Sequence, residues 1–137
     1  MKNILFILFC YCLSACNVVK DVDCGGIMCT QEYRSVEVQF VDSDGKPVEV
    51  GDFKAVNQRT KKVLSKGKDG QLAGTQGYYV VASDGNLKDI SPEGDVVMVS
   101  LKNPVSGETE SIEFQITGGI CNCHVYKVTG PDKYTID

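Results

Sequence analysis

The sequence predicts an all-β protein, built as an antiparallel sandwich or barrel of short strands. Several segments alternate apolar with polar residues, which is the period of a strand with one buried face. Clusters of glycine, proline, aspartate and asparagine separate these segments at short intervals, as turns between strands require. No window shows the i, i+3, i+4, i+7 apolar spacing of an amphipathic helix, so we expect few helices.

Five segments are predicted as strands. In 34–40 the side chains of Val36, Val38 and Phe40 share one face. The run 95–101 is apolar on both faces and rich in β-branched residues, so we expect it at the centre of a sheet. The other three strand candidates are 78–83, 111–117 and 124–128.

The segment 42–47 has the composition of a tight turn. Asp42 and Asp44 have the spacing that begins a calcium-binding loop, but the twelfth position, where such a loop needs glutamate, is Phe53. We therefore predict a β-turn here.

The beginning of the chain has the layout of an export signal. Lys2 provides a cation, an apolar run extends from residue 4 to 13, and two small residues precede Cys16. The apolar run is too short to cross a membrane as a permanent helix.

The stretch LSAC, which ends at Cys16, resembles the lipobox of bacterial lipoproteins. This resemblance implies that residues 1–15 are a lipoprotein signal peptide and that Cys16 becomes the acylated first residue of the mature protein. The lipid would make the membrane a partner through an anchor. The alternative is an ordinary signal peptide, with Cys16 left unmodified.

We expect a lipidated tether over 16–32 and one β-sandwich domain over 33–137, since this length suits a single core. Asp21 and Asp23 resemble the signal that sends some Bacteroidetes lipoproteins to the cell surface. The predicted location is the cell envelope, at the outer membrane, with the domain facing either the periplasm or the outside.

A second resemblance concerns the domain itself. The stretch VEVQFVDSDGKPVEVGDFKAVN resembles the opening of carboxypeptidase regulatory-like domains, with matches at Asp42, Gly45, Pro47 and Val48. The stretch YYVVASDG resembles a later strand of that family. The resemblance implies an antiparallel β-sandwich of about seven strands, immunoglobulin-like or transthyretin-like, that serves as an accessory module without catalysis. With CTQEYRSVEV and CHVYKVTGP, the chain also resembles small lipoproteins of Bacteroidetes.

Four cysteines remain after Cys16 in the predicted mature chain: Cys24, Cys29, Cys121 and Cys123. In an exported protein an even number of thiols indicates disulfides. A bridge between Cys121 and Cys123 is disfavoured, because both side chains would project from one face of a strand. Of the two remaining pairings we favour Cys24 with Cys123 and Cys29 with Cys121, as in an antiparallel approach, and the other pairing stays open.

The alternative for these cysteines is a zinc or redox site. The four thiols and His124 offer five soft ligands, which would define a thiol- or zinc-dependent envelope protein. An oxidising compartment disfavours free thiolates. On a regular strand His124 would also point away from its cysteine neighbours, so we expect a partly exposed residue there.

The remaining features favour a non-catalytic binding or scaffolding module with no cofactor. The net charge of −4, with Lys2 counted, makes nucleic acid a poor partner. No hydrolase, metalloprotease or phosphate-loop motif is present. The partner is predicted to be an envelope protein or a glycan, and the candidate contacts are Tyr78, Tyr79, Tyr126 and Tyr134.

One stretch is basic, although the chain as a whole is acidic. Its cations are Arg59, Lys61, Lys62, Lys66 and Lys68. Because turn residues surround them, we favour a solvated hairpin tip, with a contact for an anionic polymer as the alternative.

Overall fold

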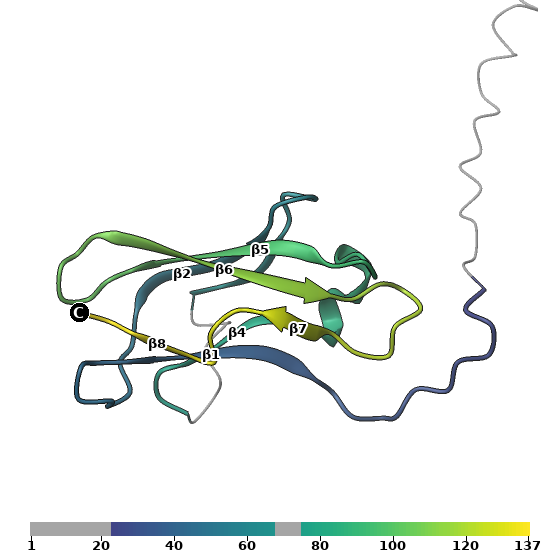
Figure 1. Ribbon diagram of the computed structural model, residues 1–137, viewed down its shortest axis with the longest axis horizontal. Coiled ribbons are helices and arrows are strands. Elements are labelled where there is room, and N and C mark those ends of the chain that lie inside the picture. The colour runs from purple at the N-terminus through teal and green to yellow at the C-terminus, as the bar shows by residue number, and fades with distance from the viewer. Residues whose placement is uncertain (1–22, 68–74) are drawn as a thin grey trace, which may run out of the picture.

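Two β-sheets face each other in the computed structural model, which describes residues 23–67 and 75–137 (Figure 1). The arrangement confirms the predicted all-β sandwich. The predicted signal peptide, Cys16 and Lys68 lie outside the described residues. Within the described ranges, no helix has the length and apolar character needed to cross a membrane.

The smaller sheet has β1 (Ser35–Val41) at its centre. β4 (Tyr78–Ser83) pairs with it in antiparallel register on one side. On the other side β8 (Lys133–Thr135) pairs in parallel, which departs from the purely antiparallel prediction. The reason is the short loop after β7, which carries the chain across to the smaller sheet so that β8 arrives running in the direction of β1 (Figure 1).

The larger sheet is antiparallel throughout. Its strands, in spatial order, are β3 (Val63–Lys66), β2 (Gly51–Asn57), β5 (Asp95–Lys102), β6 (Thr109–Thr117) and β7 (Tyr126–Thr129). The central place of β5 is the one predicted from its two apolar faces. The described residues thus hold eight strands, against about seven expected, and β2, β3 and β8 are additional to the five predicted segments.

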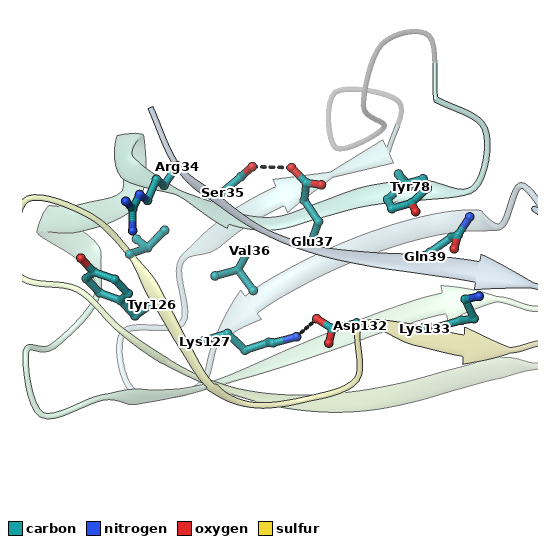
Figure 2. A pocket seen from close by; sticks show the side chains of 11 residues that line it. Arg34, Ser35, Val36, Glu37, Gln39, Tyr78, Tyr126, Lys127, Asp132 and Lys133 are labelled. Atoms are coloured by element: carbon teal, nitrogen blue, oxygen red, sulfur yellow. Dashed lines mark hydrogen bonds and ion pairs between the residues drawn. The ribbon is translucent and has the colours of Figure 1, made fainter. Parts of the chain in front are cut away.

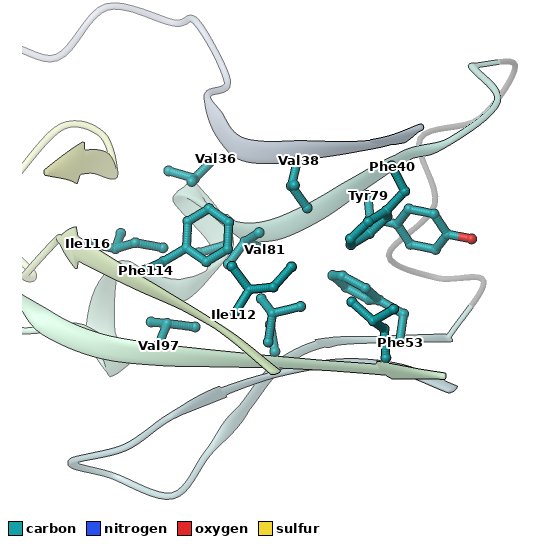
Figure 3. Close-up of a cluster of buried hydrophobic side chains, with 14 of the residues drawn as sticks. Val36, Val38, Phe40, Phe53, Tyr79, Val81, Val97, Ile112, Phe114 and Ile116 are labelled. Atoms are coloured by element: carbon teal, nitrogen blue, oxygen red, sulfur yellow. The ribbon is translucent and has the colours of Figure 1, made fainter. Parts of the chain in front are cut away.

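The core lies between the sheets, as Figure 3 shows. Val36, Val38 and Phe40 of β1 are buried, as their alternation predicted. The ring of Phe40 packs edge-on against the ring of Phe53 across the sandwich, with centroids 6.2 Å apart, and against that of Tyr79 at 5.4 Å. Such aromatic contacts join the two sheets at one end of the core.

The chain between β6 and β7 turns where a strand was predicted. Residues 124 and 125 lie outside β7, which begins at Tyr126. Gly119 has a positive φ of 103°, and a Cβ there would lie 3.1 Å from Cδ of Pro92. The prediction of a strand over 124–128 was therefore too early at its start, because the chain packs tightly against the loop after η3 before it can extend.

A short 3-10 helix, η3 (Asp84–Asp89), follows β4 directly. The backbone N–H of Ser83 donates to Oδ1 of Asn86 at 2.9 Å, which holds the first turn. This places Asp84 at the end of the sandwich where the described chain begins.

The predicted turn at 42–47 is confirmed. Oδ1 of Asp42 accepts hydrogen bonds from the backbone N–H groups of Asp44, at 3.0 Å, and Lys46, at 2.8 Å. The carboxylate is thus engaged by its own turn, as in an Asx turn.

Candidate functional site

Two disulfides join the start of the described chain to the loop before β7. Cys24 is bonded to Cys121 and Cys29 to Cys123, with a Cα–Cα distance of 5.2 Å in each bridge. The prediction of two bridges between these cysteine pairs is confirmed, but the favoured pairing was wrong. The segment 24–29 approaches 121–123 in the same chain order, because the second segment is a turn rather than one face of a strand.

The two disulfides engage all four cysteine sulfur atoms that the alternative prediction of a zinc site requires. Zinc is bound by thiolates, and a disulfide sulfur does not provide one. In residues 23–67 and 75–137 no group of three or more His, Cys, Asp or Glu side chains is arranged to hold a metal ion.

His124 is 4% exposed, which corrects the expectation of a partly exposed strand residue. Its Nδ1 lies 2.8 Å from Oδ2 of Asp84, and its Nε2 lies 3.0 Å from Oγ1 of Thr30. The ring therefore links the 3-10 helix to the disulfide-bonded segment. The burial follows from the turn at 120–124, which points the ring inward instead of across a strand.

The carboxylate of Asp84 is held by several donors. It accepts the backbone N–H of Arg34 at 2.8 Å and that of Val125 at 2.9 Å, in addition to its contact with His124. Burial opposes the ionised form, but these hydrogen bonds, with that from His124 the strongest, lower the pKa of Asp84 below its usual value. Asp84 thus fastens the start of β1 and the segment before β7 to η3.

The order Asp84, His124, Thr30 is also that of the acid, base and hydroxyl in acyl-transfer triads. Thr30 is exposed, and it lines neither of the two surface hollows described below. The three residues join η3, the turn before β7 and the segment that follows Cys29, and so extend the connection made by the two bridges. Sequence reasoning missed Asp84 and Thr30, because they are separated from His124 by 40 and 94 residues and no local pattern connects them.

A surface groove of ≈ 630 Å³ lies between β1 and the chain that forms β7 and leads to β8 (Figure 2). The ladder between β1 and β8 begins at Gln39, so in the described structure residues 35–38 have a strand neighbour only on the β4 side. β7 is the last strand of the larger sheet. Two strand edges without a further strand partner among the described residues therefore border the same groove.

The side chains of the groove are mainly polar and aromatic. Tyr78, Gln39 and Lys133 lie in register across the smaller sheet. At the other end the guanidinium of Arg34 lies 5.9 Å from the ring centroid of Tyr126, close enough for a cation–π contact. Lys127 and Asp132 form an ion pair between these ends (Figure 2).

The predicted contact residues thus separate into two groups. Tyr78 and Tyr126 line the groove, whereas Tyr79 and Tyr134 belong to the core or pack against it. Of the basic stretch, Arg59 and Lys62 form ion pairs with Asp95 and Asp89.

No protein-family model matches the chain, and neither a curated protein nor a solved structure matches it. The sandwich and its bridges define the class: a disulfide-stapled all-β domain of an oxidising, non-cytoplasmic compartment. The immunoglobulin-like or transthyretin-like subclass and the lipoprotein resemblance stay predictions.

Proposed function

We propose that the protein is a lipid-anchored, non-catalytic module of the bacterial cell envelope that binds a partner in the groove between β1 and β7. The observation that carries this proposal is the groove itself, in which two strand edges meet polar and aromatic side chains. Open strand edges present backbone groups that an extended segment can pair with. An extended segment of an envelope protein is therefore the favoured partner, and a glycan stacked on Tyr126 is the alternative.

The anchor is proposed from the lipobox-like LSAC and is supported by the two disulfides, which fit an exported protein. Cys16 would carry the lipid, and residues 17–23 would connect it to the first bridge. We place the module at the outer membrane, facing the periplasm or the outside.

Intact mass and peptide mapping without reduction test the anchor. Protein extracted from its native membrane should begin at Cys16, carry a diacylglyceryl group there, and contain the 24–121 and 29–123 bridges. A chain that begins elsewhere with an unmodified Cys16 would contradict the lipid anchor. Four free thiols or a retained metal would favour the thiol- or zinc-dependent alternative.

Photo-crosslinking tests the groove. A photoreactive residue at Gln39, on the groove wall, should capture one discrete partner in the native membrane, whereas the same residue at Val105, which is exposed in the loop after β5, should not. The partner should bind the purified protein with Tyr126→Ala and Lys133→Glu at least about tenfold more weakly, a loss of about 1.4 kcal/mol. The matched control, Val105→Ala with Lys102→Glu, makes the same change of charge outside the groove and should bind normally. Equal capture at both positions would sink the groove proposal.

A further inference from the structure

The end of the sandwich where the described chain begins exposes apolar side chains that the core does not use. Ile27 is 55% exposed, Met28 is 94% exposed and Ile120 is 53% exposed. Figure 1 shows this end opposite to the C-terminus. We call the surface formed by Ile27, Met28 and Ile120 the apolar tip.

The two disulfides hold the loops of the apolar tip together. Ile27 and Met28 lie between Cys24 and Cys29, and Ile120 directly precedes Cys121. The covalent cross-links and the hydrogen bond between His124 and Thr30 restrict both loops before any contact is made. Little conformational entropy is therefore left to lose when this surface docks.

Two cations lie beside Ile120 of the apolar tip. Arg59 and Lys88 share a surface hollow of ≈ 500 Å³ with Ile120. Lys61 and Lys62 follow Arg59 in the turn between β2 and β3, so these three cations of the basic stretch lie at this end. An apolar surface bordered by cations fits the boundary between acyl chains and phosphate groups.

Acidic groups at the same end weaken the electrostatic attraction between these cations and lipid phosphates. Asp89 is paired with Lys62, Asp95 is paired with Arg59, and Glu93 accepts a hydrogen bond from Ser91. Asp23 lies before the first bridge. We therefore expect insertion of the apolar side chains to dominate, with a weak dependence on salt.

The short tether indicates that the partner of the apolar tip is the membrane itself. Eight residue steps separate Cys16 from Cys24, so the first bridge lies at most about 28 Å from the acylated residue. This distance keeps the disulfide-bonded end of the sandwich close to the bilayer that holds the lipid. A lipid surface is thus always present beside the apolar tip at high effective concentration.

We propose that the apolar tip docks on the membrane surface, with Ile27, Met28 and Ile120 inserted at the headgroup level and Lys88 and Arg59 near the phosphates. The proposal rests on the lipid anchor proposed above. In this arrangement the lipid anchor and the apolar tip both attach the protein to the membrane. The sandwich is then oriented with its disulfide-bonded end toward the bilayer.

Oxidation of Met28 by hydrogen peroxide tests the docking. The full lipidated protein is reconstituted in vesicles of phosphatidylethanolamine and phosphatidylglycerol, and sulfoxide formation is followed by peptide mass spectrometry. Met28 in the wild type should oxidise about fivefold more slowly than in the lipidated Ile27→Asp, Ile120→Asp variant, because docking buries its thioether. Met98 within β5 serves as the internal reference.

The matched control is Val105→Asp, an exposed apolar residue in the loop at the opposite end of β5. This variant should keep the slow oxidation of Met28. Equal rates in the wild type and the double variant, on protein whose mass shows the lipid at Cys16, would overturn the docking while leaving the anchor intact. Absence of the lipid in the same spectra would instead overturn the anchor.

Discussion

The carboxylate of Asp95 accepts hydrogen bonds from three residues. Arg59 donates to both oxygens, at 2.6 and 2.8 Å, Asn57 donates at 2.6 Å, and the backbone N–H of Ser91 donates at 2.9 Å. Its side chain is 3% exposed. The bond from Arg59, together with the other donors, lowers the pKa of Asp95 from 3.8 to about 2. Arg59 of the basic stretch therefore fastens the β2–β3 turn to the start of β5.

This pKa makes part of the stability depend on pH. A carboxyl that ionises more readily in the folded state stabilises it above the unfolded pKa, and the contribution disappears as the pH falls through the folded value. The free energy of unfolding should therefore lose about 2 kcal/mol from this group between about pH 5 and 2. Denaturant titrations of the wild type and Asp95→Asn across that range would measure it. Asp132→Asn, at an exposed position, should keep the wild-type slope, and an unchanged slope in Asp95→Asn would contradict the assignment.

His124 should contribute strongly to stability, contrary to what a partly exposed residue would do. His124→Leu leaves the carboxylate of Asp84 without one of its buried donors, at a cost of about 2 to 4 kcal/mol. Thr30→Val removes only the outer bond and should cost about 1 kcal/mol. Urea unfolding with intact bridges gives both values, and a neutral His124→Leu would show that the network does not hold the fold.

Gly130 packs directly on an aromatic ring of the core. A Cβ there would lie 2.2 Å from Cδ1 of Phe114, whereas a Cβ on Gly107 would meet nothing within 4 Å. Both residues have positive φ, but the 124° of Gly130 lies farther from the left-handed region than the 76° of Gly107, so Gly130→Ala adds backbone strain as well as the clash. Gly130→Ala should be less stable than Gly107→Ala by about 2 to 3 kcal/mol in thermal or urea unfolding. Equal losses of unfolding free energy in the two variants would mean that the loop after β7 can shift to relieve the clash.

At the scale of elements, a strand can be predicted from the sequence when its hydrophobic pattern is regular and long enough to recognise. β1, β4, β5 and β6 were predicted close to their observed bounds, because their alternating or fully apolar patterns extend over six or more residues. β3 has four residues and β8 three, too few to show a period. β2 was not among the predicted segments, and its inward face ends in buried Asn57, whose partner Asp95 is 38 residues away.

The two disulfides should act as nearly one constraint. Their sequence separations are 97 and 94, so each closes almost the same loop of the unfolded chain. Replacing Cys29 and Cys123 by serine should cost about 1 kcal/mol, while replacing all four cysteines should cost about 4 to 5 kcal/mol. Chemical denaturation of the two variants and the wild type would show this strong departure from additivity. Equal steps for the first and second bridge would contradict the loop-entropy argument.

At the scale of the molecule, topology assembles what the sequence leaves apart. The four cysteines could be found from their number and compartment, although the order of approach could not. The groove could not be predicted, because it depends on β8 covering only the last part of β1 and on β7 ending the larger sheet. The same topology brings the basic β2–β3 turn beside Ile120.

Strand β1 pairs with β4 and β8, and β2 pairs with β5, so three of the strand pairings join segments that are distant in the sequence. We expect slow folding, because the chain must close these long loops before the pairings can form. The two disulfides already join the two ends of the domain in the unfolded chain, so this long loop is closed before folding begins. After urea dilution, the oxidised protein should therefore refold faster than the fully reduced protein, by about tenfold or more. Stopped-flow fluorescence of the tyrosines would compare the two. Identical rates would mean that joining the chain ends does not limit folding.

The order of the bridges also determines how the protein would respond to tension. A pull between the residues before Cys24 and the chain after Ile136 passes through the first bridge into Cys121, and residues 30–120 lie inside closed covalent loops. Only the chain from Cys121 onward, with β7 and β8, lies in the line of force. β8 runs parallel to β1, so it would be sheared along its length rather than peeled one bond at a time. Most of the sandwich would thus stay folded while its last two strands act as a short mechanical release.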